Sequence, residues 1–307
     1  LHDALPISVI ISKSRTQKVE LINIIFSILN MALPYCHGVA VLFSDSSSWR
    51  PLVVRELFVG DQHIKVTGEG VSTKGEIHGD AKLYMPLVRT ATMCSHAQLE
   101  HFSYKGSSLD IALGVLAEKA QLHFDQVQMH VSSRKPWNTD VQWSVAQKHM
   151  YVIGRPEWVL EHCSTMRMHT KVIHLNKERK EQLLKVRDAI SRRGLRVYAC
   201  ASGSDVDKWV FEGYLGCLQS PTAKTLEHIH QLNLKEQHIT LISFDYQLTA
   251  LALAKSLDIG EEHLCGQRLK HCSQEELSHA LSAYHTIYET PASVYNRLVE
   301  KVRNVYK

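Results

Sequence analysis

The chain has 307 residues, of which 44% are hydrophobic and 21% are charged, and its formal net charge is +4 with histidine neutral. These proportions are typical of a globular protein long enough to hold two domains, and they exclude an intrinsically disordered chain. The nearly balanced charge, without a basic patch interleaved with aromatic residues, predicts no nucleic-acid partner.

Seven cysteines are spread along the chain, and no two of them have C-x-x-C spacing. Because the number is odd and C-x-x-C spacing is missing, we expect free thiols in a reducing compartment and no zinc site. The 19 histidines are scattered. His228 and His230 lie two positions apart on a predicted helix and cannot share a face, so no metal ligand is predicted.

The N-terminal part is treated separately from the fold. Residues 1–8 resemble a translated sequencing-adapter fragment more than natural sequence, and residues 17–34 are predicted to form a helix. From Val19 to Leu42 the apolar stretch nearly reaches the ~20 residues of a membrane span. Polar residues such as Glu20 and Asn23 interrupt it, which favours a buried or amphipathic helix over a membrane helix.

Two apolar runs end in an aspartate. Residues 39–43 (VAVLF) stop at Ser44-Asp45, and residues 239–244 (ITLISF) stop at Asp245. Apolar runs without alternation are typical of strands buried on both faces, as in a parallel sheet. Reactive groups in such sheets lie just past the carboxyl ends of the strands. We therefore expect one sheet that carries both aspartates, with a large insertion between its two strands.

The first part of the insertion mixes strands and helices. An extended run over 52–59 precedes a hairpin or meander over 62–77, which contains turn glycines. Helical spacing predicts helices over 86–100 and 109–122, the second capped by Ser108 or Asp110.

The second part of the insertion is predicted to form antiparallel strands followed by helices. Alternation predicts strands over 127–131, 141–146 and 148–153. Pro156 suits the first turn of a helix that runs to Cys163. Asn176 is expected to cap a charged helix over 177–193 that ends at Gly194, and residues 195–200 form the next strand.

From Tyr214 onward strands and helices alternate. A strand over 215–218 precedes a helix over 220–232, and the strand that ends at Asp245 leads into a helix over 248–257. Ser273 and Glu276 have the spacing of a capping box. Thr290-Pro291 opens a last helix.

Five collinear stretches resemble the cytoplasmic part of a cation-transporting P-type ATPase, and together they cover roughly residues 38–302. They are FVGDQHIKVTGEGVSTKGEI (58–77), residues 106–122, KHMYVIGRPEWVLEHC (148–163), GLRV (194–197) and SFDYQLTALALAKSLDI (243–259).

The resemblance implies an α/β fold. A discontinuous, Rossmann-like haloacid-dehalogenase-type domain with a parallel sheet carries an inserted α+β nucleotide-binding-type domain, an antiparallel sheet flanked by helices. The implied boundaries are 1–36 for the N-terminal segment, 37–55 and 214–307 for the phosphorylation-type domain, and 56–213 for the insertion.

The resemblance places the family's catalytic aspartates at Asp45 and Asp245. The family loop D-K-T-G-T is Asp45-Ser46-Ser47-Ser48-Trp49 here, so its lysine and glycine are missing. The D-P-P-R segment is residues 219–222 (QSPT), and the S-P-x-x-K lysine aligns with Val294 or Tyr295. Phosphoryl transfer needs cations around the transferred group, so this pattern predicts impaired catalysis.

Nucleotide-binding positions are only partly kept. The resemblance aligns Asp110, Lys135, Gly154 and Arg196 with residues near the base or the phosphates. The lysine of K-G-A-P-E is replaced by Ile153, and the aromatic residue that stacks on adenine aligns with His130.

Two functions remain open. The first is a degenerate P-type ATPase module, a pseudoenzyme with weak or no ATP binding that acts through a protein partner or a membrane pump. The second is a fragment of an active pump that phosphorylates Asp45 and uses Mg. Either is expected in the cytoplasm or at the cytoplasmic face of a membrane. A haloacid-dehalogenase-type phosphatase is disfavoured, because Ser47 stands where such enzymes carry a second acidic residue.

Overall fold

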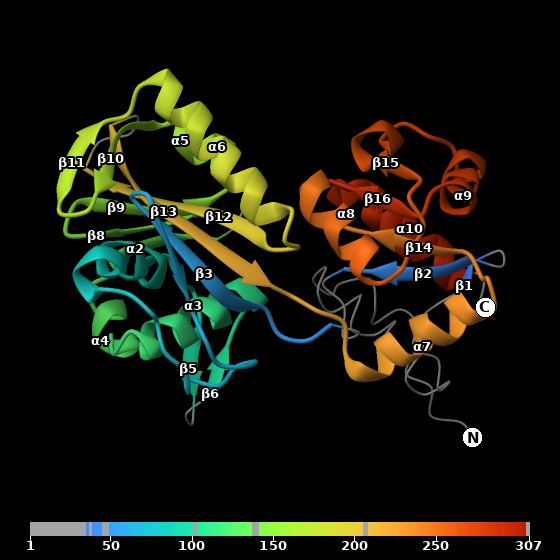
Figure 1. The fold of residues 1–307 in the computed structure, drawn as a ribbon, viewed down its shortest axis with the longest axis horizontal. Helices are drawn as coiled ribbons and strands as arrows, with labels where there is room; N and C mark the ends of the chain where they lie inside the picture. The colour runs from blue at the N-terminus through green and yellow to red at the C-terminus, as the bar shows by residue number, and fades with distance from the viewer. Residues whose placement is uncertain are drawn as a thin grey trace. The chain divides into compact units, whose positions relative to one another are not determined.

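The computed structural model describes residues 35–36, 39–44, 49–100, 103–136, 141–204 and 208–304. Asp45 and the segments 1–8 and 17–34 lie outside these residues. The chain divides into two compact units (Figure 1). Unit 1 consists of residues 1–50 and 221–307, and unit 2 of residues 51–220. Unit 1 is therefore built from two separate parts of the sequence.

Unit 1 contains a mainly parallel sheet. In the described residues its order is β1-β2-β14-β16-β15, and β1 is its one antiparallel strand. The prediction that the two apolar runs share a sheet is confirmed, because β2 and β14 pair in parallel from Ala40–Ile239 to Phe43–Ile242. The strands are β1 (Tyr35–Cys36), β2 (Val39–Phe43), β14 (Ile239–Ile242), β15 (His263–Cys265) and β16 (Thr286–Tyr288).

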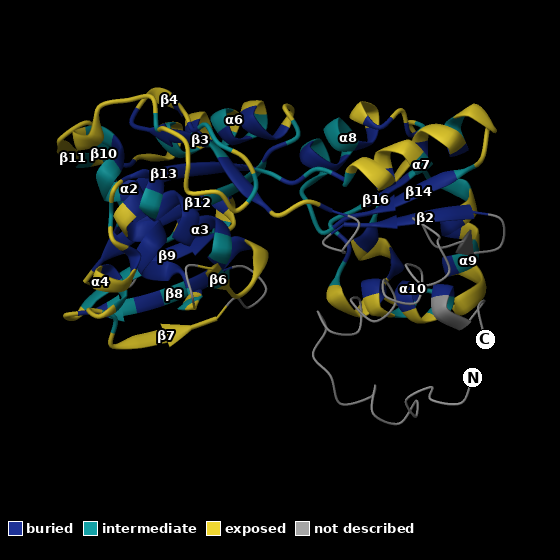
Figure 2. Ribbon diagram, turned by 90° about the horizontal axis from the view of Figure 1, so that it is seen from below, coloured by how far each residue is buried: buried dark blue, intermediate teal, exposed yellow. Residues whose placement is uncertain are grey.

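Helices cover both faces of this sheet (Figure 2). Side chains of α7 and α8 pack on Ala40 and Leu42 of β2. Those of α9 and α10 pack on Val39, Val41 and Phe43, the alternate positions of the same strand. This two-sided burial explains why β2 reads as a continuous apolar run. The helices are α7 (Ala223–Leu234), α8 (Gln247–Ser256), the 3₁₀ helix η2 (Gly266–Leu269), α9 (Gln274–Ala283) and α10 (Ala292–Asn304).

Unit 2 is organised around a larger sheet that is mostly antiparallel. Its order in the described residues is β11-β10-β13-β12-β9-β8-β7, with β3 and β4 added at β13. The long strand β13 pairs with β10 in parallel at its start and with β3 at its end. The strands are β3 (Val53–Val59), β4 (Gln62–Lys65), β7 (Ser133–Lys135), β8 (Val141–Ala146), β9 (His149–Gly154), β10 (Cys163–Met168), β11 (Lys171–His174), β12 (Arg196–Gly203) and β13 (Trp209–Leu218).

This sheet also has a core on each face. One face packs on α2 and α3 through residues such as Ile153 and Cys200. The other packs on α5 and α6 through residues such as Val152 and Ala199. A separate hairpin of β5 (Gln98–Glu100) and β6 (Ser103–Lys105) lies beside α3. The helices are α2 (Ala81–Cys94), α3 (Ser108–Lys119), α4 (Phe124–Gln128), α5 (Pro156–Glu161) and α6 (Lys177–Ser191).

Several local predictions are confirmed. Pro156 lies in the first turn of α5, and the Asn176 side chain accepts a hydrogen bond from Arg179 N at the start of α6. Gly194 has φ +76°, the left-handed conformation expected just after a helix. The capping box of Ser273 and Glu276 is present.

Three local predictions are wrong. The helix expected over 86–100 spans Ala81–Cys94, because Asp80 caps it and Pro86 lies inside it. The strand expected over 127–131 is the end of α4 and a turn, since Phe124 and Val127, three positions apart, bury the same helical face. The cap of α3 is Ser107 rather than Ser108 or Asp110.

Six cysteines among the described residues are free thiols: Cys94, Cys163, Cys200, Cys217, Cys265 and Cys272. None of the helices in the described ranges combines the length and the apolar composition that crossing a bilayer needs.

Candidate functional site

The carboxyl ends of β2 and β14 form the first candidate site. The strands are adjacent and parallel, so Ser44 and Ser243 follow them at the same edge of the sheet. Asp45 comes directly after Ser44, outside the described residues. Both serines are fully buried, and Ser44 Oγ has no hydrogen-bond partner among the described residues.

Asp245 lies in the turn after β14. Its Oδ2 atom accepts a hydrogen bond from Ser243 Oγ (2.8 Å), and its own N–H donates to the same Oγ atom (3.0 Å). Its carbonyl oxygen accepts from Glu289 N (3.0 Å), which ties this turn to the end of β16. The carboxylate is therefore held at the sheet edge, where the resemblance expects an aspartate.

Two aromatic side chains cover the end of β2. The Trp49 indole N–H donates to Phe43 O (2.7 Å), and the Tyr295 hydroxyl donates to Ser44 O (3.0 Å). Trp49 is 6% exposed and Tyr295 is 1% exposed. The Tyr295 ring stacks on Phe244 with centroids 4.4 Å apart. The carbonyl of the last β2 residue and the carbonyl of the residue after it are thus bound by neutral aromatic donors.

The second candidate site is the face of the unit 2 sheet under α2 and α3. Side chains of directly paired residues lie on the same face of a sheet. Gln142 pairs with Ile153, and Ile153 pairs with Cys200, so these three side chains lie on one face. Ile153 packs in the core formed with α2 and α3, so this face is the one that these helices cover. Arg196 lies four positions before Cys200 on β12, so it shares this face.

Asp110 joins this face from the first turn of α3. Its Oδ1 atom accepts from His96 N (2.8 Å) and from Gln142 Nε2 (2.7 Å). Its Oδ2 atom accepts from Ser107 Oγ (2.5 Å), and the residue is 6% exposed. The carboxylate therefore connects α3, β8 and the segment after α2.

Other predicted residues lie elsewhere. Lys135 pairs with Trp143, which pairs with Val152 of the opposite core, so its register assigns Lys135 to the α5 and α6 face. Gly154 ends β9 and pairs with Ala199. His130, expected to stack on a base, is exposed in the turn after α4.

Sequence reasoning missed residues on the α2 face. Arg134 pairs with Ser144, and its guanidinium donates to Gln128. Gln142 is 2% exposed and also donates to Cys94 O (2.5 Å). Burial lowers the pKa of His96, and the Arg134 charge lowers it further, while Asp110 opposes this shift. A polar residue at a buried strand position such as Gln142 was the available signal.

No group of three or more His, Cys, Asp or Glu side chains in the described parts of the chain has the arrangement of a metal site. The absence of a metal ligand in this protein stays a prediction.

Comparison with known proteins gives a consistent picture. A family model described as "P-type ATPase, cytoplasmic domain N" matches residues 84–236. The human calcium-transporting ATPase type 2C member 1 is 23% identical over 249 residues, which cover 74% of this chain and 27% of that protein. Calcium-transporting ATPase 1 of Bacillus cereus is 24% identical over 239 residues, covering 71% of this chain and 27% of that protein.

A shorter match has higher identity. Calcium-transporting ATPase 1 of Schizosaccharomyces pombe is 31% identical over 127 residues, which cover 41% of this chain and 14% of that protein. The chain therefore spans well under two thirds of the length of each of these relatives.

Proposed function

Because this chain contains a cytoplasmic domain of the P-type ATPase family, we propose that it is a module of a cation-transporting pump in which phosphoryl transfer is impaired and nucleotide binding is weak. In this proposal unit 1 is the haloacid-dehalogenase-type phosphorylation domain, and unit 2 is the nucleotide-binding domain inserted into it. The module acts at the cytoplasmic face of a membrane, by regulating or binding a protein partner or a pump.

The covering of the end of β2 by Trp49 and Tyr295 carries the proposal. The transition state of phosphoryl transfer spreads negative charge over the equatorial oxygens, and cations must neutralise that charge. The resemblance aligns a lysine of the family with Val294 or Tyr295. Val294 is fully buried, and the hydroxyl of Tyr295 donates to Ser44 O. A neutral hydroxyl engaged in this way supplies no positive charge to a phosphate on Asp45.

Nucleotide binding is proposed at the α2 face of unit 2. Arg196 lies on this face, and Arg134 is a further cation there, so a phosphate could form charge-assisted hydrogen bonds. Ile153 replaces the lysine that the resemblance expects on the same face. Loss of one cation, with Asp110 bound to three protein donors, supports weakened rather than tight binding.

A phosphorylation assay tests the catalytic part. The intact chain is incubated with Mg and γ-labelled ATP, quenched in acid, and treated with hydroxylamine. We expect no acid-stable, hydroxylamine-labile label above the level of the Asp45→Asn variant. Label that appears in the natural chain and disappears in Asp45→Asn would support the alternative, a fragment of an active pump, and would overturn the proposal of impaired catalysis.

Calorimetry with ADP and ATP tests the binding part. We expect micromolar to millimolar binding that Arg196→Ala weakens about tenfold or more, since one charge-assisted hydrogen bond is worth about 1.5–3 kcal/mol. The matched control is Arg192→Ala, which removes the same charge from an exposed position at the end of α6. If millimolar ligand gives no heat, the module is a scaffold without a nucleotide role.

A further inference from the structure

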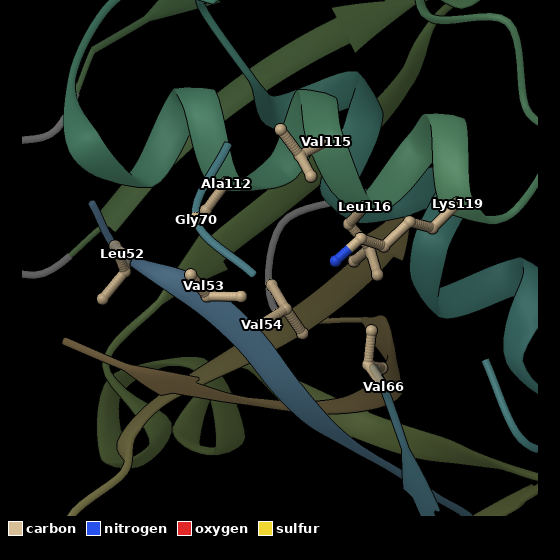
Figure 3. Close-up of a pocket in the computed structure, with 9 residues that line it drawn as sticks. All are labelled: Leu52, Val53, Val54, Val66, Gly70, Ala112, Val115, Leu116 and Lys119. Atoms are coloured by element: carbon tan, nitrogen blue, oxygen red, sulfur yellow. The ribbon is translucent and has the colours of Figure 1, made fainter. Parts of the chain in front are cut away.

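A small hollow lies between β3, the hairpin of residues 66–77 and α3 (Figure 3). Its space holds about one water molecule. The walls are apolar except for one amine, that of Lys119, which points into the hollow in Figure 3. The lining residues are Leu52, Val53, Val54, Val66, Gly70, Ala112, Val115, Leu116 and Lys119.

Two cations bind neighbouring carbonyls of the hairpin. Lys119 Nζ donates to Thr67 O (2.8 Å), and the Arg55 guanidinium donates to Gly68 O. The register between β3 and β13 shifts at Arg55, which leaves this residue opposite no partner on β13. At such a bulge a side chain need not follow the alternation of side chains between the two faces of the sheet. Arg55 can therefore reach the same turn as Lys119.

Gly68 makes this approach possible. It has φ +98°, and a Cβ atom at this position would lie 2.8 Å from Lys119 Nζ. The amine therefore lies almost directly over the backbone of the turn. Only glycine fits both the backbone conformation and the contact.

The charges of the two cations are not balanced locally. Within the described ranges, no carboxylate oxygen lies within 4.0 Å of Lys119 or Arg55, although both are hydrogen-bonded. Lys119 is 9% exposed, and its ammonium has three donors for one described acceptor. Burial lowers the pKa of Lys119, and the Arg55 charge lowers it further. A buried ammonium with unused donors needs a further acceptor.

We propose that the hollow is a binding site for one small inorganic anion, such as chloride, held by Lys119 with support from the charge of Arg55. A water molecule could use the free donors, but it would not neutralise two positive charges among apolar walls. An anion does both. The site links α3 to the hairpin, so the anion stabilises unit 2. This inference does not depend on nucleotide binding or on phosphoryl transfer.

Chlorine-35 NMR on the intact chain tests the site. The line width of chloride is measured in sodium gluconate buffer at constant ionic strength, with and without protein. We expect excess broadening that saturates with chloride in the millimolar range and that bromide displaces. Lys119→Met keeps most of the length of the side chain without its charge, and it should weaken this component at least tenfold.

Two further variants complete the test. Lys185→Met removes a lysine from the exposed side of α6 and should leave the broadening unchanged. Ala112→Val fills the hollow while keeping both cations, so it should also remove the broadening, and it decides the matter if Lys119→Met does not fold. The proposal is overturned if Lys119→Met or Ala112→Val, correctly folded by circular dichroism, broadens the line as the natural chain does. It is equally overturned if the natural chain gives no saturable broadening, in which case the hollow holds water.

Discussion

The hydroxyl of Tyr295 donates a hydrogen bond to the carbonyl oxygen of Ser44, 3.0 Å away and 251 positions earlier in the chain. The bond joins α10 to the end of β2, so it connects the two sequence segments that make up unit 1. The Tyr295 ring also contacts Phe43 edge to face, with centroids 5.2 Å apart. The last residues of the buried strand are thus held by a residue near the other end of the chain.

Tyr295→Phe should loosen the end of β2 while keeping the ring contacts. A buried hydrogen bond contributes about 1 kcal/mol net, so opening of residues 39–44 should become about fivefold more frequent. Hydrogen exchange with mass spectrometry on this peptide measures the change. Tyr288→Phe on β16 is the matched control, because the Tyr288 hydroxyl makes no hydrogen bond to a described residue. Equal exchange in the two variants would show that the Tyr295 bond contributes nothing.

Local signals predicted much of the fold correctly. Because β2 and β14 are buried on both faces, their sequences are continuous apolar runs that predict strands. Caps such as Asn176 and Ser273 mark helix starts through short-range hydrogen bonds. The parallel pairing of β10 with β13 and the pairing of β13 with β3 join residues far apart in sequence. No local pattern encodes such pairs, because their stability comes from the shared core.

The site could be predicted only in part. The sequence indicates that Trp49 is bulky for its loop and that a lysine is missing near Tyr295. It does not indicate that both side chains donate to the end of β2, since that depends on how α10 and residue 49 pack. Lys135 and Arg134 are adjacent cations, and only the strand register assigns them to opposite faces.

Gly68→Ala should destabilise the hairpin far more than Gly70→Ala. Both glycines have positive φ, but a Cβ at Gly68 would lie 2.2 Å from Lys74 O, whereas nothing lies within 4 Å of a Cβ at Gly70. We expect about 1 kcal/mol for Gly70→Ala and about 3 kcal/mol or more for Gly68→Ala. Urea unfolding of the intact chain, with exchange of residues 62–77 as local probe, measures both. Similar losses would contradict the close approach at Gly68.

Glu212→Gln should destabilise unit 2. Glu212 is 2% exposed and accepts two hydrogen bonds from Arg167 (2.6 and 3.1 Å) and one from Ser202 Oγ (2.9 Å). Removing one partner of a buried ion pair costs about 3–5 kcal/mol, and we expect the lower end because Arg167 is partly exposed. Denaturant unfolding measures the loss.

The double variant Glu212→Gln, Arg167→Met provides the control for this pair. Methionine removes the cation that the first substitution leaves without a carboxylate, so part of the lost stability should return. The single variant Arg167→Met is measured as well. If the double variant loses the sum of what Glu212→Gln and Arg167→Met lose separately, the interaction between the two side chains makes no net contribution to the stability of unit 2.

Acid should destabilise unit 1 through His238. The rings of His238 and His285 lie 4.0 Å apart beside β14 and β16, and His238 Nε2 is buried without a described partner. Burial lowers the pKa of His238, and the neighbouring His285 lowers it further, while carbonyls of Tyr284 and Leu281 and the carboxylate of Glu262 oppose the shift. The folded state then binds fewer protons than the unfolded state. Stability is therefore full above about pH 6.5 and falls as the pH drops through the folded pKa.

His238→Gln should reduce this acid sensitivity, because glutamine does not titrate. The difference in opening free energy of β14 between pH 7.5 and pH 5.5, from hydrogen exchange corrected for intrinsic rates, should shrink relative to the natural chain. His230→Gln, on the exposed side of α7, is the control and should leave the difference unchanged. An undiminished acid loss in His238→Gln would mean that another group titrates.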